Sequence, residues 1–197
     1  MEDSLEKIYK DVASCSGCQL CSGRTNVVPG IGHPKARIMF IGEGPGRDED
    51  LQGKPFVGAA GKLLTELIES IGLSRSDVYI ANVIKCRPPN NRDPFPEEIE
   101  ACWPYLVRQI KFVKPDLVVM LGRHSMGKFL PGSKISEVHG QPKVYKGIWQ
   151  KKQVYLPLYH PAVALYDPRK KEVLFEDFKK IPLILKKISL SQKKNDS

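Results

Sequence analysis

Apolar residues along the chain occur either in short runs or at helical spacing. Four runs predict buried strands, at residues 37–41, 78–84, 116–121 and 153–159. Apolar residues three and four positions apart, with nearby caps, predict helices at residues 5–13, 60–71, 124–130 and 171–187, and one beginning near residue 97. Because strands and helices alternate, we expect an α/β fold in which helices cover both faces of a mainly parallel sheet.

Chain length and two local features refine this picture. The 197 residues, 41% of them hydrophobic, suffice for one substantial core, so we predict a single domain over residues 1–190. Pro104 is expected to kink or split the helix that begins near residue 97. The final SQKKNDS, residues 191–197, is predicted to be a disordered basic tail.

The distribution of charge points to a surface for a polyanion. The chain has 31 Lys and Arg against 22 Asp and Glu, a net charge of +9, and residues 134–197 hold 14 of the basic and 6 of the acidic residues. A solvated lysine-rich tail would explain the same excess of basic residues. The sequence leaves both interpretations open, a polyanion-binding surface and a solvated tail. No run approaches the roughly 20 apolar residues of a membrane span, and the N-terminus is charged, so we expect a cytoplasmic protein that does not enter membranes.

Cysteine spacing indicates a metal site. Five cysteines are an odd number for a disulfide framework, and clustered cysteines in a reducing compartment more often bind metal or perform redox chemistry. Cys15 and Cys18 form a C-x2-C pair, while Cys86 and Cys102 lie far along the chain. Four thiolates suit zinc or an iron–sulfur cluster by count. Either centre would link cysteines that lie far apart in the sequence.

The segment GEGPG, residues 42–46, follows the first predicted strand and resembles a nucleotide-binding loop only superficially. Arg47 stands where a dinucleotide fingerprint needs glycine, and Phe56 and Leu63 break a Walker pattern ending at residues 61–62. What remains is a turn whose backbone can approach a flat ligand, with Glu43 as its titratable group. The alternative is a tight turn with an exposed glutamate.

Three other residues have unusual settings. Phe56 lies in the glycine-flanked loop GKPFVG, where an aromatic ring either stacks on a base or packs beneath its own loop. Asn82 interrupts an apolar strand, and leaving its amide without partners would cost about 1–3 kcal/mol, which a ligand could offset. His160 directly follows a strand and precedes Pro161. Because parallel strands place ligands at their carboxyl ends, we expect these groups to converge.

Taken in order, the motifs resemble those of the family 4 uracil-DNA glycosylases, the iron–sulfur group of that superfamily. The match runs from about Cys15 to Leu165, and its motifs are C-x2-C, GEGPG with Glu49-Asp50, GKPFVG, NVIKCRPP with Asn91-Arg92, Cys102 and HPAVAL. Several linked motifs in one order are far more specific than any one of them. The resemblance implies a three-layer α/β/α sandwich.

The resemblance also implies an activity and its residues. The expected enzyme is a monofunctional DNA-repair glycosylase that flips uracil out of DNA and hydrolyses its N-glycosidic bond, leaving an abasic site. The implied uracil-binding residues are Gly42, Glu43, Gly44, Phe56, Asn82 and His160. Phe56 would stack on uracil, Asn82 would read its edge, and His160 would stabilise the leaving base. Family 1 enzymes carry an aspartate where Gly44 stands, so Glu43 is the nearest substitute for positioning water.

For the metal, the resemblance implies that one structural 4Fe-4S cluster is held by Cys15, Cys18, Cys86 and Cys102. Cys21 extends the first pair to a ferredoxin-like C-x2-C-x2-C run, but the family does not require it, so we treat it as a spectator. An iron–sulfur electron carrier and a zinc-stabilised nucleic-acid-binding module are the competing interpretations. The carrier leaves GEGPG, Asn82 and His160 without a role, and the binding module leaves His160 unexplained.

The expected partner is uracil-containing DNA, single- or double-stranded, bound by a monomer, and a replication-clamp partner is left open. One departure from the family concerns the histidine motif, which commonly continues to an arginine where this chain has Tyr166, with Arg169 three residues later. We expect residues 162–171 to meet the DNA backbone, with Leu165 as the wedge that fills the vacated stack.

Overall fold

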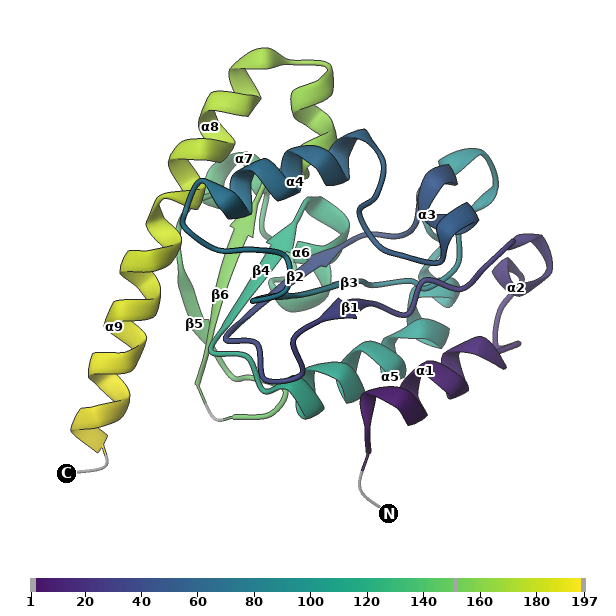
Figure 1. The fold of residues 1–197 in the computed structure, drawn as a ribbon, viewed down its shortest axis with the longest axis horizontal. Helices are drawn as coiled ribbons and strands as arrows, with labels where there is room; N and C mark the ends of the chain where they lie inside the picture. The colour runs from purple at the N-terminus through teal and green to yellow at the C-terminus, as the bar shows by residue number, and fades with distance from the viewer. Residues whose placement is uncertain (1–2, 151, 196–197) are drawn as a thin grey trace.

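A mixed sheet forms the centre of the molecule, for which the computed structural model describes residues 3–150 and 152–195 (Figure 1). Within these residues its strand order is β1-β3-β2-β4-β6-β5. The strands are β1 (Ile31–Gly32), β2 (Ile38–Gly42), β3 (Tyr79–Asn82), β4 (Leu117–Leu121), β5 (Lys143–Tyr145) and β6 (Gln153–Leu158). The four inner strands run parallel, and β1 and β5 pair antiparallel at the two edges. The predicted mainly parallel sheet is confirmed.

Helices cover both faces of this sheet, as alternation along the strands requires. In β2, Met39 and Ile41 face one apolar core, whereas Ile38 and Phe40 face the other. The first core is closed by α1 (Leu5–Ala13), α2 (Leu20–Gly23), α5 (Pro96–Val113), α6 (Arg123–Phe129) and α7 (Ile135–Val138). The second is closed by α4 (Ala59–Glu69), α8 (Pro168–Phe178) and α9 (Lys180–Asn195). The expected three-layer α/β/α sandwich is therefore confirmed (Figure 1).

Two predicted helix boundaries are corrected. The helix expected over residues 171–187 is two helices, α8 and α9, which meet at Lys179. Pro182 has no N–H to donate to the carbonyl of Phe178, so one continuous helix is disfavoured there. Pro104, by contrast, does not split α5, which runs without interruption from Pro96 to Val113. The carbonyl that loses its partner to Pro104 belongs to Glu100, an exposed residue that water can reach.

The C-terminal end also differs from expectation. Helix α9 continues to Asn195, so residues 191–195 are helical and not a disordered tail, while residues 196–197 lie outside the described part. Ser191 Oγ donates to the carbonyl of Lys187 at 3.0 Å, and Gln192 Nε2 donates to Asp116 Oδ1 at 3.2 Å. These bonds hold the last turns. No helix among the described residues is long and apolar enough to cross a bilayer.

Candidate active site

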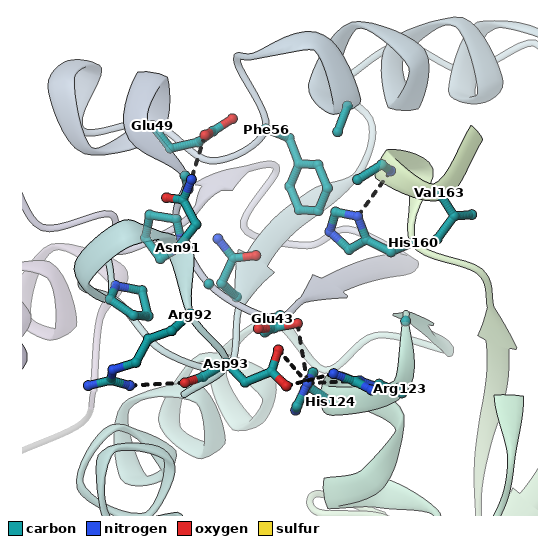
Figure 2. Close-up of a pocket in the computed structure, with 18 of the residues that line it drawn as sticks. Glu43, Glu49, Phe56, Asn91, Arg92, Asp93, Arg123, His124, His160 and Val163 are labelled. Atoms are coloured by element: carbon teal, nitrogen blue, oxygen red, sulfur yellow. Dashed lines mark hydrogen bonds and ion pairs between the residues drawn. The ribbon is translucent and has the colours of Figure 1, made fainter. Parts of the chain in front are cut away.

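The carboxyl ends of the parallel strands enclose one cavity of about 640 Å³. Asn82 ends β3, Gly122 follows β4, and His160 lies two residues after β6. The cavity is lined by five of the six predicted pocket residues, which are Glu43, Gly44, Phe56, Asn82 and His160. Figure 2 shows Phe56 and His160 in one part of the cavity and Glu43, Asp93 and His124 in another. The sequence-predicted residues therefore converge as expected.

Gly42 is the sixth predicted residue, and it supports the cavity without lining it. A Cβ atom at this position would overlap Asn82 Oδ1 and would lie 2.7 Å from Phe56 Cζ. At Gly44, a Cβ atom would lie 2.6 Å from Ile84 Cγ1. Neither position has room for a side chain unless its neighbours move. The side chain of Ile84 thus occupies the place toward which a larger residue at position 44 would extend.

The Asn82 side chain is buried in the cavity wall and has an unsatisfied hydrogen-bond acceptor. It is 1% exposed, and its Oδ1 is the one buried side-chain N or O atom of the described residues that lacks a hydrogen-bond partner. Lys85 fixes the turn after the strand, because its buried Nζ donates to the Asn82 carbonyl at 2.8 Å and to Gln109 Oε1 at 2.7 Å. Burial lowers the pKa of Lys85 to about 7. Because buried polar atoms are almost always hydrogen-bonded, we expect Asn82 Oδ1 to accept a hydrogen bond from a bound ligand.

The Phe56 loop is held in a strained conformation by Glu49. Phe56 has φ 54°, which a bulky side chain rarely adopts. Glu49 Oε1 accepts from the N–H groups of Val57 and Gly58 at 2.9 Å each, and its Oε2 accepts from Gly46 at 3.1 Å. One carboxylate therefore joins the GEGPG and GKPFVG loops. The sequence analysis gave Glu49 no role. A glutamate at the third position of a helix, here α3 (Arg47–Gln52), commonly accepts from the backbone N–H just before the helix, and this signal was available.

His160 is a neutral imidazole facing Phe56. The two rings stack with centroids 5.5 Å apart and planes 25° from parallel. Burial lowers the pKa of His160 to about 4, with Glu49 opposing the shift, so the ring is uncharged near pH 7. Nδ1 accepts the N–H of Ala162 at 3.1 Å, which assigns the ring proton to Nε2. The cavity thereby gains one directed donor without a formal charge.

Glu43 belongs to a charged cluster at the other side of the cavity. His124 Nε2 lies 3.8 Å from Glu43 Oε2 and 3.2 Å from Asp93 Oδ1. Burial raises the pKa of Glu43, His124 opposes the shift, and Asp93 adds to it. The three groups lie within 4.8 Å of one another, a spacing that suits a metal ion. Arg123 already donates to Asp93 at 2.6 Å and to His124 at 3.0 Å, so it supplies the positive charge and we assign no metal here.

Asn91 is a cavity residue to which the sequence reading gave no role. It ends the 3-10 turn η1 (Pro89–Asn91), has φ 54°, and accepts a hydrogen bond from Arg87 Nε at 2.7 Å. The sequence does contain a signal for this turn, which is two consecutive asparagines after two prolines. Asparagine tolerates the left-handed backbone conformation that such a turn requires. Its amide is the second in the cavity lining, besides that of Asn82.

Residues after His160 form an exposed edge of the cavity. The 3-10 turn η2 (Pro161–Leu165) begins directly after His160, and Ala162 and Val163 line the cavity. Leu165 is 49% exposed and Tyr166 is 88% exposed. The DNA-contacting role of residues 162–171 stays a prediction.

The predicted metal ligands come from three segments. Cys15 and Cys18 lie in the loop between α1 and α2, Cys86 lies four residues after β3, and Cys102 lies on α5. The thiols are near enough to interact electrostatically. Among the described residues, however, no three of the cysteine sulfurs lie within 4.8 Å of one another. That spacing is wider than a single tetrahedral zinc requires, since Zn–S bonds of about 2.3 Å place sulfurs about 3.8 Å apart.

Each of these four sulfurs has an N–H group of the chain beside it. The pairs are Gly17 with Cys15, Leu20 with Cys18, Arg24 with Cys86 and Lys85 with Cys102. Burial raises the pKa of Cys102 to about 11, and the neighbouring N–H opposes the shift. The Gly17 N–H lies 3.4 Å from Cys15 Sγ, and Arg24 Nη1 lies 3.3 Å from Cys86 Sγ. The spectator role of Cys21 stays a prediction.

Comparisons with known proteins agree with this geometry. A family model described as "Uracil DNA glycosylase superfamily" matches residues 29–181. The chain is 55% identical to a type-4 uracil-DNA glycosylase of Sulfurisphaera tokodaii, over 91% of this chain and 84% of the relative. It is 54% identical to one of Archaeoglobus fulgidus, over 91% and 92%, and 44% identical to one of Thermotoga maritima, over 94% and 97%.

Proposed function

The chain belongs to the uracil DNA glycosylase superfamily, and within it to the type-4 enzymes, and we propose that its strand-end cavity removes uracil from DNA. The protein is a uracil-DNA glycosylase of DNA repair: it hydrolyses the N-glycosidic bond of deoxyuridine and leaves an abasic site. An electron carrier or a zinc-stabilised binding module would leave this cavity without a purpose. Release of free uracil from a uracil-containing oligonucleotide tests the function.

The observation that carries the proposal is the orphaned Asn82 Oδ1. Uracil presents an N3–H donor beside its O4 acceptor, so one amide in the orientation found here can satisfy both. Cytosine presents an acceptor at N3 and an amino donor at position 4, the reverse arrangement. Pairing cytosine with the same amide would therefore leave buried polar groups unmatched, at a cost of about 1–3 kcal/mol.

Access to the cavity requires the base to leave the duplex. Extrusion costs a few kcal/mol, least for a mispaired base such as uracil opposite guanine. We propose that Phe56 stacks on the face of the extruded uracil, on a loop that Glu49 keeps in place before the base arrives. Leu165 is proposed to fill the vacated stack from its exposed position beside the cavity. We propose that a monomer is the catalytic unit.

His160 is proposed to stabilise the departing base. As the glycosidic bond breaks, negative charge develops on uracil, much of it at O2, and the Nε2–H of a neutral imidazole can donate to that atom. The hydrogen bond strengthens toward the transition state, which is the condition for catalysis and not merely for binding. Burial keeps the ring uncharged, so the donor is in place without a prior change in protonation.

Water completes the reaction, and Glu43 is proposed to orient it. Its carboxylate lines the cavity, while position 44 has no room for the aspartate of family 1 enzymes unless Ile84 moves. The described lining residues include no lysine, the residue whose amine would attack the sugar in a bifunctional lyase. Hydrolysis by water, without strand cleavage, is therefore the proposed outcome.

The pH dependence of cleavage tests the role of Glu43. An ionised Glu43 is needed to orient water, and its pKa lies above the usual range, so the single-turnover rate is expected to fall as pH decreases through that raised pKa. Glu43→Gln should lower the rate and remove this acidic limb. Asp93→Asn should instead keep the limb and move it to lower pH, because Asp93 helps to raise the pKa. An unchanged rate profile for Glu43→Gln would exclude the role.

We propose that Cys15, Cys18, Cys86 and Cys102 hold one 4Fe-4S cluster. The segments that carry these cysteines lie near one another, and N–H donors of the kind that tune cluster sulfurs lie beside Cys15 and Cys86. When bound, the cluster would supply a cross-link between segments distant in sequence. Since glycosidic hydrolysis transfers no electrons, its proposed role is structural.

Replacing individual cysteines tests the ligand set. Cys86→Ser is expected to abolish the visible absorption of the cluster, reduce bound iron and lower the melting temperature, because the lost cross-link closes a loop of more than 60 residues between Cys18 and Cys86. Cys21→Ser is the matched control, and it should retain colour, iron and stability. Loss of iron in the Cys21 variant with retention in the Cys86 variant would refute the assignment.

A further inference from the structure

Arg24 connects the segments that carry the cysteines. Its Nη2 donates to the carbonyl of Ala13 at 3.0 Å, at the end of α1, and its Nη1 donates to the carbonyl of Cys15 at 3.0 Å. The same Nη1 lies 3.3 Å from Cys86 Sγ, to which it donates as well. Arg24 and Cys86 are 62 positions apart in the sequence. One guanidinium group thus spans the N-terminal cysteine loop and the segment that follows β3.

The charge of Arg24 is directed at the thiols and at no carboxylate. None of the ion pairs among the described residues includes Arg24. The groups that interact electrostatically with it are the sulfurs of Cys86, Cys21 and Cys15. A guanidinium group is always protonated, and a partly buried one needs negative charge nearby. Neutral thiols do not supply that charge, whereas thiolates bound to a metal do.

We propose that Arg24 is the positioning residue of the cysteine set: it clamps the Cys15 loop to Cys86 and supplies a charge-assisted hydrogen bond to the Cys86 sulfur. The proposal rests on the proposed 4Fe-4S cluster. Four thiolates and the oxidised core of such a cluster leave a net negative charge, which a fixed cation offsets. The planar fork of arginine suits a site with three acceptors, and the single ammonium of lysine reproduces its charge but not its geometry.

Two properties of the bound metal follow. A cation and an N–H donor beside a ligand sulfur favour the thiolate and hence metal retention. They also favour the reduced, more negative state of a cluster and so raise its reduction potential. Removing Arg24 is therefore expected to weaken retention and to lower the potential together. A residue that merely tightened the fold would change retention without changing the potential.

Arg108 provides the matched control. It also ties the N-terminal segment to α5, through Asp3 at 2.6 Å and Asp11 at 2.7 Å, but it donates to no cysteine sulfur among the described residues. Arg108→Met thus loosens the same region without removing a bond to sulfur. Arg24→Met removes charge and hydrogen bonds, and Arg24→Lys keeps the charge alone.

The experiment compares the purified full-length parent with these three variants by iron content, loss of visible absorption under an iron chelator, and the one-electron reduction potential. Arg24→Met is expected to lose iron at least tenfold faster than the parent. Its reduction potential should be lower by at least 59 mV, which for one electron corresponds to a tenfold change in the reduction equilibrium constant. Arg24→Lys should lie between Arg24→Met and the parent. Arg108→Met should stay within twofold of the parent in both measurements.

Three results would overturn the proposal. The first is an Arg24→Met protein with the retention and potential of the parent. The second is an Arg108→Met protein that changes as much as Arg24→Met, which would mean that Arg24 acts only by holding the segment. The third is a parent that contains no iron, which refutes the cofactor itself. Uracil cleavage by the same parent sample then shows separately whether the glycosylase function stands.

Discussion

Replacing His160 with alanine is expected to lower the single-turnover rate of uracil cleavage by about 10²–10³, the usual effect of removing one donor aimed at developing charge. The variant should bind uracil-containing DNA with nearly the affinity of the parent, because the bond from Nε2 is proposed to strengthen only as the base departs. The measurement is rapid-quench cleavage with enzyme in excess, together with a binding titration. Rate and affinity must be separated, since only the rate reports on the transition state.

His33 offers a matched control for this experiment. Its Nδ1 accepts the N–H of Lys35 at 3.1 Å, the same local bond that His160 makes with Ala162, yet it does not line the cavity. His33→Ala should cleave at the rate of the parent. If His160→Ala also cleaves at that rate under single-turnover conditions, His160 has no role in stabilising the leaving base.

The second large effect is expected from Asn82→Asp. A carboxylate accepts hydrogen bonds but cannot donate to uracil O4, so cleavage of uracil should fall by about 10- to 100-fold, the equivalent of about 1–3 kcal/mol for one mismatched buried group. The cytosine amino group can donate to the same carboxylate. Cleavage of cytosine should therefore rise above the parent level, and selectivity should decrease by more than the loss of uracil activity alone.

Asn82→Ala separates this effect from damage to the turn that Lys85 holds. Alanine removes both hydrogen-bonding groups, so the Asn82→Ala variant should lose uracil cleavage without any gain on cytosine. Parallel assays of both variants on oligonucleotides with one uracil or one cytosine give the comparison. Identical uracil-to-cytosine ratios in the parent and Asn82→Asp would show that this side chain does not read the base.

Periodicity predicted the main elements of the fold because burial dictates it. In an α/β sandwich, an apolar run such as residues 117–121 forms a central strand that helices cover on both faces. The short edge strands β1 and β5 were not predicted, since two or three half-exposed residues carry no pattern. The break between α8 and α9 depends on one proline, whereas Pro104 does not interrupt α5. Proline alone therefore did not determine where a helix ends.

The cavity was predictable where a residue is anomalous for its own element. Asn82 in an apolar strand and Phe56 between glycines were identified as candidate site residues in this way, and the structure brings both to the same cavity. Glu49 was not identified, because its role depends on contacts with a loop eight and nine residues later. Asn91 likewise depends on the path of its loop. Such roles arise from tertiary placement, which local pattern does not encode.

The most direct test of the glycosylase assignment is incubation of the purified protein with an oligonucleotide containing one uracil, followed by hot alkali and by assay of the free base. We predict release of uracil in the same amount as alkali-labile sites, cleavage only at the uracil position, and no strand break before alkali is added. An otherwise identical oligonucleotide with thymine at that position should remain intact. Absence of both free uracil and alkali-labile sites, with DNA binding retained, would contradict the assignment.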